Sequence, residues 1–483
     1  MKLTFPSPPL LMSLPLLIVL FGFPVALGAK TNEEVPHRAQ VLILGAGAAG
    51  ISAAKYLHDH GVKDFVIIDA ENRIGGRVKA SEFGGKIVEL GANWVQGTDG
   101  NPLWDLAKKY KMAGVVSNYD SYVTRDVNGN DVTSVSDAAF RKFARANRVV
   151  DRIREFRQKN KMADVPLRGA LRYGGWPMRR TPVEDVVEMF DIDFEFAVPA
   201  DEMTVLYQPA LQENYKQEDF FITDQRGFGY ILEQLADEFL TDGATRRLYL
   251  NETITRVSYD GQGVKVKTKS GKTFSGDYAI CTFSIGVLQS DAVKFVPRFP
   301  EKRQLAFNSF TMGTYTKIFM RFNASAQRFW DDEEYILYAH PTRGYYAMWQ
   351  NLEAVGLHPA GTNILLVSVF DDEADRVSRL PVATVEAELT AVLRSMYGAQ
   401  VPEPVEILVP DWHTNPLYYG SFSNWPPWMS ADTHALMGAP LNHTLYFAGE
   451  AYSVGYYGYL HGAMHSGNQT AQQIISSIGL KSA

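Results

Sequence analysis

Apolar and polar positions near the start of the chain follow the patterns of two kinds of regular structure. Ala39–Leu44 and Phe65–Ile68 are short, unbroken apolar runs of the kind that form buried strands. Between them, a glycine-rich turn precedes a stretch from Ala48 to about His60 that favours a helix. A strand, a helix and a second strand in this order predict a βαβ unit in a parallel sheet.

Farther along the chain, helix and strand patterns come in blocks. From Ser136 to about Lys161, apolar residues recur at near-helical spacing among Arg, Lys and Asp, which predicts an amphipathic helix with a solvated face. Further helices are expected over Val186–Ala197 and His461–Ile478. Strands are expected at Leu248–Tyr259, Gly263–Thr268, Lys317–Phe322, Ile364–Phe370 and Leu445–Ala448.

The composition is that of a globular protein with a sizeable core. The chain has 483 residues, of which 46% are hydrophobic, and a formal net charge of −7. This length exceeds that of one ordinary domain and predicts two. The chain has no long run of basic residues that would indicate a nucleic-acid partner. The basic residues of the helix at Ser136–Lys161 are interpreted as surface charge. No metal site is predicted.

The first 29 residues differ from the rest of the chain. Lys2 precedes an apolar run over Leu10–Phe23, and small residues follow at Ala26, Gly28 and Ala29. This pattern predicts a secretory signal peptide, with an uncleaved anchor as the alternative. No later segment is apolar enough to span a membrane. Four glycosylation sequons agree with export of the protein, at Asn251, Asn323, Asn442 and Asn468.

A dinucleotide-binding motif lies in the first βαβ unit. Gly45, Gly47 and Gly50 form G-x-G-x-x-G between the first strand and the first helix. Gly45 permits the tight turn, Gly47 lets the backbone approach a pyrophosphate, and Gly50 lets the helix pack on the strand. Asp69 ends the second strand and is placed to accept hydrogen bonds from ribose hydroxyls. The motif by itself does not distinguish FAD from NAD.

Two later motifs add candidate cofactor contacts. Arg77 follows two glycines in Asn72-Arg-Ile-Gly-Gly-Arg77 and can hold a phosphate. Gly449 and Glu450 end the strand Leu445-Tyr-Phe-Ala before the C-terminal helix. Together with five further motifs, these residues make the chain resemble the flavin amine oxidase superfamily. The five motifs are ELGANWVQG at 89–97, TPVEDVV at 181–187, YTKIF at 315–319, FSNWP at 422–426 and YGYLHGA at 457–463. Within this superfamily, the extracellular polyamine oxidases of plants are the most similar group.

The resemblance runs through nearly all of Ala39–Ile478 and implies an α/β fold with two interleaved domains. The Rossmann-like, FAD-binding domain is expected at 38–115, 215–300 and 411–478. A substrate domain of mixed β-sheet flanked by helices is expected at 116–214 and 301–410. FAD is expected to bind non-covalently, because Cys281, the only cysteine, lies in an apolar run typical of a buried strand. A monomer is expected.

The resemblance also implies the residues of an amine-oxidising site. Lys317 matches the active-site lysine, and Tyr315 a tyrosine of the substrate tunnel. Trp412, Phe422 and Tyr459 match aromatic residues that flank the flavin and the substrate, and Glu195 matches a tunnel carboxylate. From their local patterns alone, a strand-edge lysine, ordinary aromatic packing and a solvated helix charge remain alternatives.

One position departs from the family pattern. Gln96 stands where the plant enzymes have a glutamate, and an amide can hydrogen-bond an amine but cannot neutralise it. The predicted function is oxidation of spermidine or spermine with O₂ and water to an aldehyde, a smaller amine and H₂O₂. The alternatives are another flavin amine oxidase, an L-amino-acid oxidase that would need a cation such as Arg73, Arg226 or Arg343 to bind the substrate carboxylate, and a non-catalytic flavoprotein.

Overall fold

The computed structural model describes residues 37–208, 215, 218–240, 247–323, 328–358 and 361–481. The predicted signal peptide at residues 1–29 lies outside the described residues. Within the described part of the chain, no helix is both long enough and apolar enough to cross a bilayer.

The largest sheet has eight strands and contains the predicted βαβ unit. Its order is β13-β10-β11-β12-β1-β2-β9, with β21 also paired to β12. The strands are β1 (His37–Leu44), β2 (Phe65–Ile68), β9 (Leu248–Tyr249), β10 (Ile254–Asp260), β11 (Gly263–Thr268), β12 (Thr273–Cys281), β13 (Lys294–Val296) and β21 (Leu445–Phe447). β9, β2, β1, β12 and β21 run parallel. Their carboxyl ends therefore meet at one edge of the sheet.

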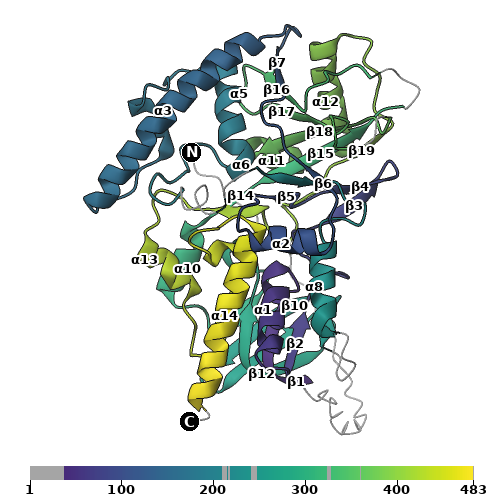
Figure 1. Cartoon of the computed structure of the whole chain (residues 1–483). Helices are drawn as coiled ribbons and strands as arrows, with labels where there is room; N and C mark the ends of the chain where they lie inside the picture. Colours follow the sequence, from purple (N-terminus) through teal and green to yellow (C-terminus); the bar gives the residue numbers. More distant parts are fainter. Residues whose placement is uncertain are drawn as a thin grey trace, which may run out of the picture. The chain divides into compact units, whose positions relative to one another are not determined.

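Both faces of this sheet are buried because its side chains alternate between two cores. Val41, Ile43 and Ile67 pack against α1 (Ala48–Asp59), α8 (Tyr230–Leu240) and α14 (Leu460–Lys481). Figure 1 shows α1 and α14 side by side across this face. Leu42 and Leu44 point to the opposite core, which includes α9 (Ile285–Gln289), α10 (Glu301–Ser309) and α13 (Ala431–Gly438). Unbroken apolar strands are the expected consequence.

The second large sheet has six strands and is mixed. Its order is β19-β15-β18-β17-β16-β7, antiparallel except for the β16–β7 pair. The strands are β7 (Tyr122–Asp126), β15 (Tyr315–Arg321), β16 (Tyr335–Ala339), β17 (Met348–Asn351), β18 (Ile364–Phe370) and β19 (Glu406–Leu408). α11 (Asp371–Ser378) and α12 (Val382–Tyr397) cover one face, and α5 (Pro182–Asp191) packs on the other. The expected α/β class, with a second mixed sheet flanked by helices, is confirmed.

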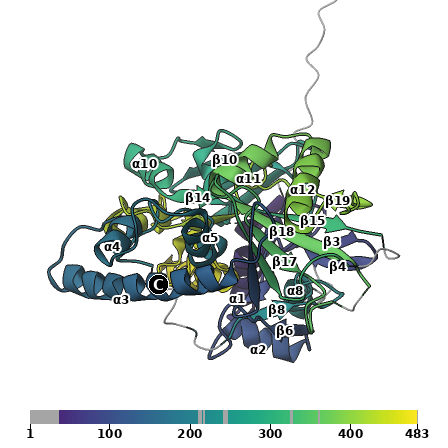
Figure 2. The ribbon, with the colours of Figure 1, turned by 90° about the horizontal axis from the view of Figure 1, so that it is seen from above.

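Short strands and helices complete the described structure. β5 (Trp94–Val95), β8 (Phe220–Ile222) and β6 (Gly114–Val116) form a three-stranded sheet. Two further antiparallel pairs are the hairpin of β3 (Ala80–Phe83) with β4 (Lys86–Glu89), and β14 (Thr311–Gly313) with the distant β20 (Phe422–Asn424). The remaining helices are α2 (Pro102–Lys109), α3 (Thr133–Lys159), α4 (Leu167–Tyr173), α6 (Asp193–Phe196) and the short 3₁₀ helix η1 (Glu450–Tyr452). Figure 2 shows the long α3 with α4 and α5 on one side of it.

Two of the predicted elements are wrong because each is divided in the structure. The helix expected over Val186–Ala197 is α5 followed by α6, since Ile192 leaves helical geometry at φ −119° and ψ −66°. The strand expected over Leu248–Tyr259 is β9 followed by β10, because Asn251 has a φ of +59° and turns the chain. β9 then pairs with β2, whereas β10 pairs with β11. Apolar periodicity does not reveal such breaks.

Candidate active site

A cavity of about 520 Å³ lies between the carboxyl ends of the parallel strands in the largest sheet and strands β15 and β20. Thirteen of the fourteen predicted site residues line it, drawn from ten separate segments of the chain. They are Gly45, Gly47, Asp69, Arg77, Gln96, Glu195, Tyr315, Lys317, Trp412, Phe422, Gly449, Glu450 and Tyr459. Gly50 is the exception, and it lies behind the glycine-rich turn. The structure therefore brings the predicted residues together, while their individual roles stay predictions.

The glycine-rich turn fits a nucleotide cofactor because each glycine meets a different geometric demand. Gly45 has a φ of +119°, and a Cβ there would lie 2.3 Å from the Thr282 hydroxyl oxygen. A Cβ at Gly50 would lie 2.0 Å from the Gly45 carbonyl oxygen, so α1 packs this closely on β1 only with glycine. A Cβ at Gly47 would meet no atom within 4 Å. The space beside Gly47 is therefore open. Because no side chain caps the N-terminus of α1 there, its backbone N–H groups can bind a phosphate.

Asp69 and Glu450 hold the walls of this end of the cavity. The Asp69 carboxylate accepts hydrogen bonds from the backbone N–H groups of Ala46, at 2.6 Å, and Glu71, at 2.8 Å. Burial raises the pKa of Asp69. Glu450 pairs with Arg77 at 2.8 Å and accepts from Gly458 N–H at 2.9 Å. Because Arg77 and Glu450 neutralise each other, Arg77 is better placed to orient a bound group than to supply an unpaired charge.

Lys317 lies in the centre of β15 and is only 3% exposed, so the alternative of a solvent-facing strand lysine is wrong. Its Nζ donates to the carbonyl oxygens of Gly91 (2.7 Å) and Glu89 (3.3 Å) and to Oδ1 of Asn93 (3.3 Å). The ammonium nitrogen also lies 5.1 Å from the centre of the Trp94 ring.

Burial shifts the acid–base behaviour of this lysine and of its neighbour. Desolvation lowers the pKa of Lys317, and the charge of Glu89 opposes that shift. Desolvation raises the pKa of Glu89, whose Oε1 accepts from Phe228 N–H at 2.6 Å. Lys317 therefore releases its proton more easily than an exposed lysine.

Trp412 packs beside the same segment of chain. Its indole N–H donates to the Leu90 carbonyl oxygen at 3.2 Å. A Cβ at Gly91 would lie 1.8 Å from the Arg77 carbonyl oxygen and 3.4 Å from the Trp412 ring. Trp412 and Lys317 thus fix the strand-like segment 89–93 from two sides.

The opposite end of the cavity has aromatic walls and a buried carboxyl group. The Tyr459 hydroxyl donates to Oε1 of Glu195, which lies on α6. Burial raises the pKa of Glu195 to about 7, and the charge of Asp219 adds to this shift. Tyr315 packs 4.7 Å from the Phe370 ring and 6.0 Å from Phe422, measured between ring centroids. The walls suit an extended aliphatic chain that carries a cation.

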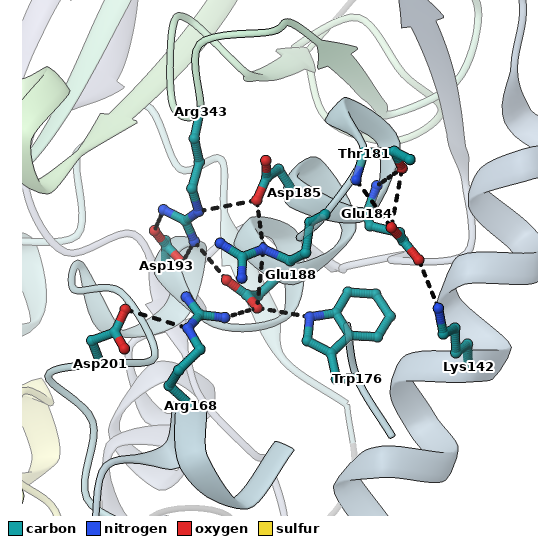
Figure 3. A network of polar contacts seen from close by, with 11 residues as sticks. Lys142, Arg168, Trp176, Thr181, Glu184, Asp185, Glu188, Asp193, Asp201 and Arg343 are labelled. Atoms are coloured by element: carbon teal, nitrogen blue, oxygen red, sulfur yellow. Dashed lines mark hydrogen bonds and ion pairs between the residues drawn. The ribbon is translucent and has the colours of Figure 1, made fainter. Parts of the chain in front are cut away.

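A buried ion-pair network fixes the short helix that carries Glu195. Figure 3 shows Arg343 reaching the carboxylates of both Glu188 and Asp193. Arg343 donates to the two oxygens of Asp193 at 2.7 and 2.8 Å. Arg168 and the Trp176 indole bind Glu188 from the other side. Because Asp193 begins α6, this pairing positions Glu195 two residues later.

Asp219 is a carboxylate close to the cavity that was not predicted from the sequence. Strands β5 and β8 pair Val95 with Phe220, so Asp219 lies opposite Gln96 in the continued antiparallel register. Its carboxylate accepts from Gly97 N–H at 2.8 Å and from the Tyr119 hydroxyl at 3.0 Å, and burial raises its pKa. Tyr119 and Gln96 both line the cavity. No local motif marks Asp219, because its position depends on pairing between distant strands.

The parallel sheet, the open glycine-rich turn and the acid at the end of β2 define a dinucleotide-binding α/β enzyme. Residues 48–475 match the family of flavin containing amine oxidoreductases, and the chain belongs to this family. It is therefore an FAD-dependent amine oxidoreductase. The open turn at Gly47 and the acid at Asp69 fit the nucleotide part of this cofactor.

Known proteins of this family resemble the chain over most of its length. It is 35% identical to polyamine oxidase 7 of Oryza sativa subsp. japonica, with 89% of this chain and 93% of that protein covered. It is also 35% identical to polyamine oxidase 1 of Zea mays, with 90% of each covered. The structure of a putrescine oxidase bound to putrescine matches with a TM-score of 0.71 at 17% identity, over 91% of this chain and 99% of that one. This last likeness supports the fold.

Proposed function

We propose that the protein is a polyamine oxidase, which converts spermidine or spermine with O₂ and water to an aldehyde, a smaller amine and H₂O₂. The observation that carries the proposal is the charge at the aromatic end of the cavity. Glu195 lines it and Asp219 lies close by, so a polycation finds carboxylates there. The likeness to two plant polyamine oxidases supports the same substrate class.

An L-amino-acid substrate is less well supported, because it requires an unpaired cation for its carboxylate. Arg343 binds Asp193 and Glu188, and Arg226 binds Asp224 at 2.7 Å. Arg73 pairs with Glu71 at 2.6 Å and donates to backbone carbonyls. Among the described lining residues, the arginine and lysine side chains are Arg77, which is paired with Glu450, and Lys317.

The bound flavin supplies the acceptor for hydride from the carbon next to the amine nitrogen. The residues of the chain hold the amine and handle protons around it. Aromatic side chains at 315, 422 and 459 exclude water from the aliphatic part of the substrate. We propose that Lys317 exchanges a proton with water or amine at its Nζ, because burial favours the neutral form of this lysine.

The proposed cofactor domain comprises 38–115, 215–300 and 411–478, and the proposed substrate domain comprises 116–214 and 301–410. The division is supported by the strands of the two large sheets, which come from these two sets of segments. Non-covalent FAD binding is supported by Cys281, which is fully buried in β12 and absent from the described cavity lining. Burial raises the pKa of its thiol to about 12, which disfavours the reactive thiolate.

We also propose that the protein is exported as a glycosylated monomer. The leader pattern and the sequons support export, and Asn251, Asn323 and Asn442 have exposed side chains. Asn468 is half-buried within α14 and is a poorer acceptor. N-terminal sequencing of the mature protein is expected to begin near Ala29 or Lys30. An intact Met1 on protein retained in cells would contradict export.

The reaction is tested by mass analysis of the products that the purified protein forms from spermidine and spermine.

Lys317→Met is expected to slow flavin reduction or reoxidation in stopped-flow measurements by roughly 100- to 10,000-fold, the usual contribution of a general acid–base group. The KM is expected to change less, because the lysine acts at the reacting centre. Lys265→Met, at an exposed lysine of β11, is the matched control. Wild-type rates in Lys317→Met would contradict the proton-handling role.

The raised pKa of Glu195 predicts a pH-dependent KM. Below about pH 7 the free enzyme carries this carboxyl group protonated, and above it the group is ionised. The KM for spermidine is therefore expected to fall as the pH rises through 7, because the ionised group attracts the substrate cation. Glu195→Gln is expected to lose this transition in steady-state kinetics. The same profile in both enzymes would assign the transition to the substrate amine itself.

Asp219 is proposed to supply the charge that Gln96 lacks. Asp219→Asn is expected to raise the KM for spermidine by roughly fivefold or more with little change in kcat, because a carboxylate in a partly desolvated site attracts the cation strongly. Glu218→Gln, at the neighbouring exposed carboxylate, is the control. Adding Gln96→Glu to the Asp219→Asn enzyme is expected to restore the affinity. An unchanged KM in Asp219→Asn would show that its charge does not reach the substrate.

A further inference from the structure

Basic residues are concentrated in one part of this acidic protein. Residues 141–180 contain thirteen Lys and Arg and three Asp and Glu, a net charge of +10, whereas the whole chain carries −7. The remainder of the chain therefore carries −17. This separation of charge is centred on α3 and the α4 region that packs against it.

Four arginines form a single row along the outer face of α3, which we call the α3 arginine row. They are Arg141, Arg145, Arg148 and Arg152, and all four side chains are exposed. Spacings of four, three and four residues keep them within about 40° of one line on the helix, over roughly 16 Å. The buried residues Ala139, Phe143, Ala146 and Val150 lie on the opposite face. The packing of α3 therefore directs the row into solvent.

The arginine row lacks the partners that neighbouring basic residues have. Lys142 pairs with Glu184 at 2.8 Å, and Arg154 pairs with Asp151 at 2.7 Å. Figure 3 shows Lys142, Arg168 and Arg343 all engaged with carboxylates. Among the described residues, the four row arginines make no ion pair and no hydrogen bond. Their guanidinium forks are available to a ligand.

We propose that the α3 arginine row binds a linear acidic polysaccharide. A guanidinium fork binds carboxylate or sulfate groups in a bidentate manner, and four forks in line match repeated anions along one extended chain. The proposed export of the protein makes an acidic polysaccharide the polyanion that it meets. This binding is separate from the catalytic cavity, which contains none of the four arginines among its described lining residues.

The narrowness of the row favours a thread-like polymer over a flat anionic membrane. On α3 the row is bordered by Ala144, Asn147 and Asp151, and Glu155 ends it on the same face. A membrane-binding helix would place apolar side chains beside its cations for insertion. Beside the row, between Arg141 and Arg152, the apolar side chains are the small Ala144 and the half-buried Val149, and the exposed Phe156 follows one turn after Arg152. Between Arg141 and Arg152 no exposed aromatic ring borders the row, whereas binding of nucleic-acid bases uses several such rings in succession.

The test is retention of the holoenzyme on immobilised polygalacturonate at low ionic strength, with elution by salt. Retention is expected despite the net negative charge. The variant Arg141→Gln/Arg145→Gln/Arg148→Gln/Arg152→Gln is expected to bind roughly tenfold more weakly or worse, because four modest exposed pairs are lost together. Its flavin spectrum, melting temperature and kcat are expected to match the wild type. The charge-matched control is Lys265→Gln/Lys267→Gln/Lys269→Gln/Lys294→Gln, at exposed lysines of the large-sheet region.

Dextran sulfate, neutral dextran and anionic lipid vesicles complete the experiment. Stronger binding to polygalacturonate than to dextran sulfate would assign the ligand to uronate carboxylates, and the reverse order to sulfate esters. Either result with row-dependent retention supports the proposal. Equal weakening in the lysine control, retention independent of the row, binding to neutral dextran, or preferred binding to the vesicles would each overturn it.

Discussion

The burial of Lys317 in β15 is the interaction on which the arrangement of the cavity depends. Its Nζ binds two backbone carbonyls and one amide oxygen of segment 89–93. That segment follows β4 directly and leads into β5, whereas β15 belongs to the second large sheet. The Lys317 side chain therefore links segment 89–93 to β15, and residues of both line the cavity. Burying an ammonium group costs free energy unless its N–H donors are satisfied, and the three oxygens around Lys317 Nζ offset part of that cost.

Burial of an ionisable group also determines the far end of the cavity, where the group is a carboxyl instead of an ammonium. Glu195 is half-buried at the cavity wall, and its carboxyl group is held by the Tyr459 hydroxyl rather than by a cation. The nearby cations are used elsewhere, since Arg343 and Arg168 are paired with Asp193 and Glu188. That network stabilises α6 without neutralising Glu195. The Glu195 carboxyl group therefore stays available for a cationic substrate, because the network positions α6 and does not neutralise this group.

Charge is also separated on the scale of the whole chain. The acidic groups that matter for the cavity lie inside, while the unpaired basic groups of α3 lie on the outer face of a helix whose other face is packed. A polyamine and a polyanion would therefore meet different parts of the molecule. Binding of one has no direct electrostatic conflict with binding of the other, because dissolved salt at about 0.1 M screens exposed charges that are more than about 10 Å apart.

The sequence by itself determined the local elements and the chemistry that depends on neighbours in the chain. The glycine-rich turn, the strands at 39–44 and 65–68, and the acid at Asp69 follow from spacing, because a βαβ unit is built from contiguous residues. The family motifs also identified Lys317 and Glu195 as candidates, and both line the cavity. Tertiary structure alone decided that Lys317 is buried, because strand periodicity does not reveal which face is covered. It also decided that Ile192 divides a helix, because apolar periodicity does not reveal such a break. Asp219 lies across from Gln96 only in the folded chain, since pairing between strands more than a hundred residues apart leaves no local pattern in the sequence.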